Sequence, residues 1–427
     1  MAQHVDVAIV GAGLSGLVAA RWLGDAGLRV AVYEAGDDVG GRVRTDEVDG
    51  FLLDRGFQVV CPAYPALAAE FDVDALHLRP FARGLAVRHR GRMHRLRADI
   101  TAPAAVTGGL LPLGDAFALA ALGVRGALGP ARPLKREPDR TTLEVLKEAG
   151  FSPAGVDRVL RPFLAGVLLE DRLTTSGRFF QLVWRSFLHG GGAVPAQGMR
   201  ALPRQLAGHL PDGTVHLGAR VDRLTPAGLA VAGGDEIRAD VVVVAADASA
   251  AALLLPGLAE PGWHGVTTFY HAADTPPRRD ALPIVDAEQP GLVRNTVVLS
   301  AAAAGYAPSG QALIATSVLD TVTPLDELER RVRGRLSVLY GTDTAGWRLL
   351  RAYRVPHALP AMPAPHPLRR TVRYGERRYV CGDHRDTSSI QGALVSGRRV
   401  ARAVLEDLHG PVGRVLVGSG SGRSAPR

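Results

Sequence analysis

The fold is decided by residues 5–35, which read VDVAIVGAGLSGLVAARWLGDAGLRVAVYEA. The first six residues are mostly apolar and predict a short strand, and the glycines that follow have the spacing G-x-G-x-x-G. Apolar residues then recur at helical spacing up to Gly27, and a second predicted strand ends at Glu34. This order of strand, glycine turn, helix and strand, with a carboxylate about 20 residues beyond the glycines, is typical of a dinucleotide-binding unit.

The three glycines and the carboxylate each suit a dinucleotide for a physical reason. Gly11 permits the tight turn out of the strand, Gly13 lets the backbone approach a pyrophosphate, and Gly16 allows the helix to pack closely on the strand. The helix N-terminus offers unpaired N–H groups to the phosphates, and Glu34 can accept hydrogen bonds from both ribose hydroxyls. A glycine-rich turn in an unrelated α/β unit is the alternative. The predicted dinucleotide contacts in this unit are Gly11, Gly13, Leu14, Ser15, Gly16, Glu34 and Ala35.

A second glycine motif, Gly40-Gly41-Arg42, follows the carboxylate within a few residues. Two glycines expose backbone donors, and the guanidinium of Arg42 can bind a phosphate through two parallel hydrogen bonds, although a solvated surface arginine is the simpler alternative. The motif resembles the extended fingerprint of the superfamily of flavin amine oxidases, phytoene desaturases and protoporphyrinogen oxidases. In that superfamily the Gly-Gly-Arg lies over the pyrophosphate of FAD, so the resemblance implies FAD as the cofactor.

The resemblance continues in two internal segments. Residues 48–60 would form a strand that brings the chain beneath the flavin ring, so that Gly56, Phe57 and Gln58 line the isoalloxazine. Plain core packing is the alternative for Phe57. Further along, the residue of the family that matches Val221 bonds the adenine through its backbone, which implies the same contact here.

The last segment that carries the resemblance is residues 379–404, where a predicted strand ends at Gly382-Asp383 and a helix follows. Ser388, with Gln391 three residues later, predicts a capping box for that helix. In the family the aspartate bonds the ribityl or pyrophosphate part of FAD. The helix N-terminus points at the flavin, where it stabilises negative charge on the reduced ring. The flavin contacts implied here are Gly382, Asp383, Gln391, Gly392 and Ala393.

The resemblance implies an α/β fold with two domains whose segments alternate along the chain. A Rossmann-like FAD-binding domain with a parallel sheet, discontinuous in sequence, would be joined to a second, α+β substrate domain. The FAD-binding domain is predicted to comprise residues 1–84, 190–262 and 366–409. The substrate domain is predicted to comprise residues 85–189, mostly helical, and 263–365, an antiparallel sheet plus a helix. Residues 410–427, rich in Gly, Ser and Arg, predict a disordered tail.

The composition argues against several classes of protein. The 427 residues carry a net charge of +8. Lys135 and Lys147 are the only lysines, so nearly all the positive charge comes from arginine. No nucleic-acid-binding motif accompanies these arginines. Cys61 and Cys381 are the only cysteines, so neither a disulfide framework nor a cysteine-based metal site is expected. The first predicted strand begins near residue 5, which leaves no room for a signal peptide, and the expected location is cytoplasmic.

Two stretches leave peripheral contact with a membrane open. Residues 85–96 predict a hairpin that turns at Arg90-Gly91 and is the most basic local stretch, which suits an anionic surface or, more simply, a solvated hairpin. Residues 102–130 predict one or two apolar helices, which charged residues interrupt too often for a membrane span. In related enzymes this region can form a substrate tunnel or a membrane patch.

The predicted function is FAD-dependent removal of a hydride equivalent from a mostly apolar small molecule. The reaction would be a C–C or C–N desaturation of the phytoene desaturase or protoporphyrinogen oxidase type, with dioxygen or a quinone as electron acceptor. Amine oxidases of the family commonly use a lysine near the flavin and an aromatic cage, and neither is evident in this sequence. A flavin amine oxidase, an NAD(P)-dependent dehydrogenase, and a non-redox flavin isomerase or flavin-binding protein remain alternatives. The catalytic side chains stay unknown, no metal is expected, and the candidates are Gln58, Tyr353 and His357.

Overall fold

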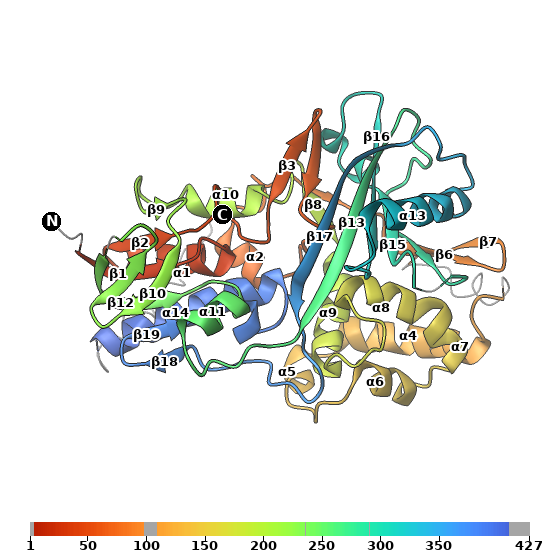
Figure 1. Ribbon diagram of the computed structural model, residues 1–427. Helices are drawn as coiled ribbons and strands as arrows, with labels where there is room; N and C mark the ends of the chain where they lie inside the picture. Colours follow the sequence, from red (N-terminus) through yellow and green to blue (C-terminus); the bar gives the residue numbers. More distant parts are fainter. Residues whose placement is uncertain (1–3, 98–108, 235, 290, 410–427) are drawn as a thin grey trace, which may run out of the picture.

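Two sheets organise the molecule, each with its own helices (Figure 1). The computed structural model describes residues 4–97, 109–234, 236–289 and 291–409, so the predicted disordered tail lies outside the described residues. The first sheet contains strands from the beginning, the middle and the end of the chain, and the second contains strands from the segments between them. The predicted α/β class, with a Rossmann-like sheet that is discontinuous in sequence, is confirmed.

The first sheet has eight strands and is centred on β1 (His4–Val10). β1 pairs in parallel with β2 (Val30–Tyr33) and β12 (Glu236–Val244), and β12 pairs in parallel with β19 (Arg378–Val380). These strands are apolar runs because helices cover both faces of the parallel part. The remaining strands are β9 (Val215–His216), which is parallel to β2, and the antiparallel additions β10 (Val221–Thr225), β11 (Gly228–Val231) and β18 (Arg373–Gly375).

Alternate residues of β1 enter two different cores. Val7 and Ile9 pack in the core that contains α1 (Leu14–Asp25) and α14 (Ile390–His409), whereas Ala8 and Val10 pack in the core that contains α11 (Ala248–Leu254). The two long helices approach closely, since a Cβ atom added to Gly397 of α14 would lie 2.4 Å from the carbonyl oxygen of Ser15 in α1. The same sheet is accompanied by α2 (Pro65–Glu70) and α10 (Ala201–Ala207).

The second sheet has seven strands in the order β17-β13-β16-β15-β14-β6-β7. Every pairing is antiparallel except the one between β14 and β6, so the predicted antiparallel sheet carries one parallel step. The predicted basic hairpin is confirmed as β6 and β7, and its turn residues Arg90 and Gly91 both have positive φ angles. The strands are β6 (Gly84–His89), β7 (Arg92–Arg97), β13 (Trp263–Ala273), β14 (Ile284–Asp286), β15 (Asn295–Val298), β16 (Ala312–Val318) and β17 (Arg348–Pro360).

Helices cover this sheet from both sides. The amphipathic helix α13 (Leu325–Tyr340) packs in the core on one face. A group of helices from residues 113–190 lies together below the sheet in Figure 1. Of the predicted apolar helices in residues 102–130, the structure describes one, and residues 102–108 lie outside the described ranges. This group comprises α4 (Leu113–Leu128), α5 (Ala131–Leu134), α6 (Thr142–Glu148), α7 (Pro153–Gly155), the π-helix η1 (Val156–Leu160), α8 (Arg161–Leu168) and α9 (Gly177–Gly190).

Short elements connect these bodies. Two small antiparallel sheets pair β3 (Thr45–Val48) with β4 (Phe51–Asp54) and β5 (Leu78–Pro80) with β8 (Ala193–Pro195). One helical turn, α12 (Leu299–Ala302), and two 3₁₀ turns, η2 (Ala304–Tyr306) and η3 (Asp383–Arg385), join longer elements. Within the described ranges no helix combines the length and the apolar character needed to cross a membrane.

Candidate cofactor and substrate site

A cavity of about 1530 Å³ lies between the two sheets and the helices of residues 113–190. One part of it is lined by the glycine turn after β1, the end of β2, residues 40–43 and the turn after β19. The other part is lined by α4, η1, α8, α9 and the second sheet. The two parts are continuous, so a group held in the first part meets the contents of the second.

The glycine turn leaves open space where a large ligand could approach the backbone. Gly11, Gly13, Leu14 and Ser15 all line the cavity, and a Cβ atom added to Gly13 would meet no protein atom within 4 Å. Gly16 does not line it. A Cβ atom there would lie 2.1 Å from the carbonyl oxygen of Gly11, which agrees with close packing of helix on strand. Gly13 is therefore the open position, where a ligand can approach the backbone, and Gly16 is the crowded position, where helix packs on strand.

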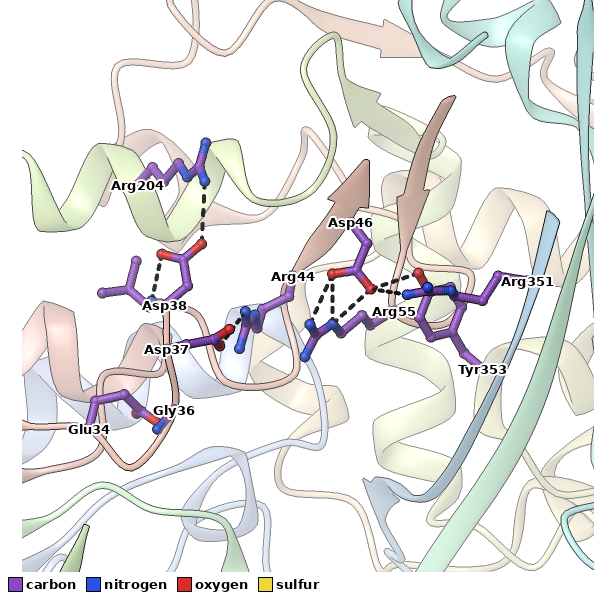
Figure 2. A network of polar contacts seen from close by, with 11 residues as sticks. Glu34, Gly36, Asp37, Asp38, Arg44, Asp46, Arg55, Arg204, Arg351 and Tyr353 are labelled. Atoms are coloured by element: carbon purple, nitrogen blue, oxygen red, sulfur yellow. Dashed lines mark hydrogen bonds and ion pairs between the residues drawn. The ribbon is translucent and has the colours of Figure 1, made fainter. Parts of the chain in front are cut away.

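The Glu34 carboxylate is held at the edge of this turn by two backbone donors. The N–H of Ala12 donates to Oε2 at 2.7 Å. The N–H of Gly36 donates to Oε1 at 2.8 Å, and Figure 2 draws these two residues. Glu34 and Ala35 line the cavity. Each carboxylate oxygen can accept a second hydrogen bond, so the group remains able to bind hydroxyls.

The Gly-Gly-Arg motif also lies on the cavity wall, but the arginine has protein partners. Gly40 and Gly41 have positive φ angles and run beside the glycine turn. Arg42 donates from Nη1 to the carbonyl oxygen of Ala358 at 2.8 Å and from Nη2 to Oδ1 of Asp383 at 2.6 Å. Its guanidinium has five N–H donors in all, so these two bonds leave donors for a further ligand.

Residues 56–58, expected beneath the flavin ring, line the cavity where its two parts meet. The N–H of Phe57 donates to Oγ1 of Thr268 in β13 at 3.2 Å, which fixes this segment to the second sheet. Gln58 donates from Nε2 to the carbonyl oxygen of Arg42 at 2.6 Å. Gly56 has a φ of +93°, a conformation that favours glycine.

The N-terminus of α14 reaches the cavity, but with a different cap from the one predicted. Gly382, Asp383 and Ala393 line the cavity. Gln391 and Gly392 do not: Oε1 of Gln391 instead accepts a hydrogen bond from the N–H of Ala66 at 3.0 Å, and Gly392 packs against the backbone of the preceding turn.

The predicted capping box of Ser388 and Gln391 is wrong. Oγ of Ser389 accepts the hydrogen bond from the N–H of Gly392 at 3.1 Å, so Ser389 is the cap. Oγ of Ser388 donates to the carbonyl oxygen of Pro360 at 2.6 Å, and Gln391 is bound to Ala66. Two consecutive serines make either register plausible in the sequence, and contacts with other segments decide between them.

The far end of the polar part is formed by β10 and α11. Val221, expected at the adenine, lines the cavity there with its neighbours Arg220 and Asp222. Asp247, which caps α11 by accepting the N–H groups of Ser249 and Ala250, lines the same end. The carboxylates of the described lining are Glu34, Asp222, Asp247 and Asp383, and all four belong to this polar part.

The second part of the cavity is an apolar chamber. No lysine lines it among the described residues: Lys135 caps α5 and Lys147 lies in the last turn of α6. Neutral polar side chains enter it from the second sheet at Asn295 and Ser317. The apolar side chains of the chamber include Leu85, Leu119, Val124, Leu128, Val159, Leu160, Phe163, Val167, Phe179, Val183, Trp184, Phe187, Leu188 and Val285.

Two of the catalytic candidates lie outside the cavity lining. Tyr353 donates its hydroxyl to Asp46 at 2.7 Å, within a polar network that also contains Arg55 and Arg351 (Figure 2). His357 stacks on Trp263 with a ring separation of 4.7 Å. The third candidate, Gln58, does line the cavity.

Sequence reasoning missed several polar side chains of the cavity wall, among them Tyr64, Asp247, Asn295 and Ser317. Tyr64 lines it at the start of α2, and only the following proline signals a helix start there. Asn295 and Ser317 lie in apolar stretches whose partners cannot be read from the sequence.

Comparison with known proteins places this geometry in a family. The sequence pattern of the flavin containing amine oxidoreductases matches residues 14–405. Hydroxysqualene dehydroxylase from Rhodopseudomonas palustris is 29% identical over an alignment of 431 positions, which covers 93% of this chain and 98% of that protein. Putrescine oxidase from Kocuria rosea is 49% identical, but over 78 residues that cover 18% of this chain and 16% of that protein. A solved structure of a putative protoporphyrinogen oxidase from Exiguobacterium sp. 255-15 has a TM-score of 0.73 at 19% identity and covers 95% of this chain and 99% of that chain.

Proposed function

The chain belongs to the family of flavin containing amine oxidoreductases, and from this premise we propose that it oxidises or reduces a long, mostly apolar molecule of the isoprenoid type. The predicted family, the cofactor FAD and the oxidoreductase class are confirmed by that membership. When FAD is bound, its flavin ring can accept a hydride equivalent and pass it on. What is proposed concerns the substrate, the acceptor and the residues that carry out each task.

The polar part of the cavity supports a set of cofactor contacts. The open position at Gly13 and the N–H groups of α1 would hold the pyrophosphate, and Glu34 would bind a ribose. Val221 would face the adenine, residues 56–58 would lie beside the ring, and the N-terminus of α14 would stabilise negative charge there. The chain's own groups thus bind, orient and shield the cofactor.

The observation that carries the substrate proposal is the apolar chamber. Its aliphatic and aromatic walls are continuous with the polar part, so a hydrocarbon chain would be buried there against the cofactor. Such walls also exclude water from the place where the two molecules meet. A relative that spans nearly the whole chain is named for an isoprenoid, hydroxysqualene, which supports the same class.

An amine substrate is the second candidate, and the chamber gives it little support. An ammonium group buried in this chamber would need a carboxylate or a cage of aromatic faces, because burying an unpaired charge is costly. The carboxylates of the described lining all belong to the cofactor part. Among the aromatic rings of the chamber, Phe163 meets Trp184 and Phe187 edge to face, so these rings pack on one another and do not form a pair of parallel walls around an ammonium group. The local similarity to putrescine oxidase covers only 18% of the chain.

Helix α4 supports contact with a lipid surface as the route of entry. Leu113, Phe117, Val124 and Leu128 are 60%, 69%, 59% and 81% exposed, and their spacing of 4, 7 and 4 residues places them on one face. Val124 and Leu128 also line the chamber, so the exposed face and the cavity share a border. An apolar substrate dissolved in a bilayer could pass along this border, and we propose peripheral contact of α4 with lipid.

The substrate class is tested by anaerobic titration of the purified holoenzyme, after its released flavin has been identified as FAD. Addition of a C30 isoprenoid should bleach the visible bands of the oxidised flavin, or restore them in the pre-reduced enzyme, and putrescine should do neither. If putrescine bleaches the flavin and the isoprenoid does not, the amine oxidase alternative replaces the proposal. Conversion of the isoprenoid without any change in flavin bands would favour a non-redox isomerase. Repeating the turnover with dioxygen or a quinone identifies the acceptor.

A further inference from the structure

A row of polar residues crosses four adjacent strands of the second sheet. In the strand registers Tyr353 of β17 is opposite Thr268 of β13, Thr268 is opposite Ser317 of β16, and Ser317 is opposite Asn295 of β15. Residues directly opposite each other in a sheet point to the same face. All four side chains therefore face the cavity side of the sheet.

The two ends of this row have different partners. Tyr353 donates to Asp46 at 2.7 Å, and Thr268 accepts from the N–H of Phe57 at 3.2 Å, so these two attach the sheet to the segment beside the cofactor site. Ser317 and Asn295 line the apolar chamber instead. Neither side chain has a hydrogen-bond partner among the residues that the structure describes, and Oδ1 of Asn295 is buried without one.

The opposite face of the same strand pair, β15 and β16, differs. There the hydroxyl of Thr296 lies 2.9 Å from that of Thr316 and 3.0 Å from that of Tyr340, so these three hydroxyls satisfy one another, although Nδ1 of His271 in β13 is buried there without a partner. A buried polar group without a partner costs stability, and such groups are rare in folded proteins. Asn295 and Ser317 are therefore best explained by a partner that enters the chamber.

The surrounding structure leaves room for this pair and holds it in place. A Cβ atom added to Gly166 of α8 would lie 2.5 Å from Nδ2 of Asn295, so only glycine leaves that amide undisturbed. The neighbouring Arg294 donates from Nη2 to Oδ2 of Asp171 at 2.6 Å, which ties the start of β15 to the segment after α8. Glycine weakens a helix interior, and here it allows an amide to face the chamber.

We propose that Asn295 and Ser317 form a subsite for one neutral oxygen function, a hydroxyl or a carbonyl, on the otherwise apolar substrate; this rests on the proposed function. An amide and a hydroxyl both donate and accept hydrogen bonds, which suits an alcohol or a ketone. Adjacent strands lie about 4.8 Å apart, so the pair is one and two strands away from Thr268 and the Phe57 segment. The subsite thus fixes which carbons of the chain lie beside the cofactor.

The test compares two ligands that differ only in oxygen. Binding of all-trans-farnesol, and of the C15 hydrocarbon that lacks only its hydroxyl, is measured on the FAD-loaded protein by quenching of tryptophan fluorescence, since Trp184 lines the chamber. The wild-type protein should bind the alcohol at least about tenfold more tightly than the hydrocarbon. Asn295→Leu and Ser317→Ala should each reduce that ratio to about threefold or less, and Ser317→Thr should retain it.

The matched control is Thr296→Val, which removes a hydroxyl from the same strand pair but on the face beneath α13. It should lower the melting temperature and leave the ratio unchanged. A ratio that stays at wild-type size in folded Asn295→Leu and Ser317→Ala, or a wild-type ratio near one, would overturn the subsite while leaving an apolar substrate in place. Failure of both ligands to bind would overturn the isoprenoid proposal itself, and the subsite with it.

Discussion

Arg42 and Asp383 are 341 residues apart in the sequence and 2.6 Å apart in space, measured from Nη2 to Oδ1. The carboxylate side chain is 7% exposed and the arginine side chain 34% exposed. Because Arg42 also donates to the carbonyl oxygen of Ala358, one guanidinium joins three distant segments at the edge of the cavity. Arg42 therefore has a structural role in addition to the phosphate contact that we propose for it.

Replacing Arg42 by Met is expected to destabilise the cofactor-free protein by roughly 2 kcal/mol, because it leaves the buried Asp383 carboxylate unpaired. Adding Asp383→Asn to that variant removes the unpaired charge and should recover most of the loss. Thermal unfolding of the wild type, of each single variant (Arg42→Met and Asp383→Asn) and of the double variant measures the coupling between the two side chains. FAD content should stay low in every variant that lacks Arg42, and full loading of Arg42→Met would contradict a phosphate contact.

Gly13→Val should purify as a folded protein with at least tenfold less FAD than the wild type. A Cβ atom added at this position meets no protein atom within 4 Å, so the valine side chain would extend into the open space beside the turn, where we place the pyrophosphate. Gly24→Ala is the matched control, since a Cβ atom added to Gly24 also meets no other atom within 4 Å, and Gly24 lies at the opposite end of the same helix. It should keep its FAD and gain slight thermal stability. Equal flavin content in the two variants would show that the pyrophosphate does not lie at this turn.

Asp54 should make the protein less stable as the pH rises from 4 to 7. Burial raises the pKa of this carboxyl to about 6, while hydrogen bonds from Thr45, Met199 and Tyr306 oppose that rise. The folded state therefore holds the proton more tightly than the unfolded chain, so the stabilisation is complete below pH 4 and is lost as the pH passes 6.

At 1.36 kcal/mol per pKa unit the loss approaches about 3 kcal/mol at pH 8. Asp54→Asn should flatten the dependence of the unfolding free energy on pH in this window, whereas Asp212→Asn, on the exposed surface, should not. Denaturant unfolding at a series of pH values measures both. An unchanged slope in Asp54→Asn would show that other groups dominate.

The combined replacement of Leu113, Phe117 and Leu128 by Ser should weaken binding to phospholipid vesicles at least tenfold, because it removes most of the apolar surface of α4. Leu253→Ser with Val322→Ser is the control: these residues are 84% and 85% exposed and lie on other elements. Flotation with vesicles of phosphatidylcholine and phosphatidylglycerol measures the binding. If the wild-type protein does not float, α4 is not a lipid-binding face.

Local patterns in the sequence were sufficient for much of the fold. The glycine turn, the helix after it and the carboxylate at Glu34 are continuous in the sequence, and the structure keeps them together at the end of β1 and β2. The hairpin of β6 and β7 was predicted from alternation and a turn at Arg90-Gly91, because such a turn needs only neighbouring residues.

Features that depend on distant contacts could not be predicted. The N-cap of α14 is Ser389 and not the predicted Ser388, because the hydroxyl of Ser388 donates to the carbonyl oxygen of Pro360 instead. The pairing of Asn295 with Ser317 follows from a strand register that no local pattern encodes. The π-helix η1 precedes Pro162, which has no N–H to donate, but the sequence alone does not say how a helix absorbs that loss.

The place of β19 and α14 in the first sheet also constrains how the protein is made. A ribosome releases β1, α1 and β2 first, yet α1 gains its partner α14 only after more than 360 further residues have been translated. In the same way β12 gains its partner β19 only after more than 130 further residues. Until α14 has been translated, the apolar face of α1 that packs on it stays exposed in the nascent chain, and we expect chaperones to bind that face. Flavin capture should accordingly be an event of late translation or of the released chain.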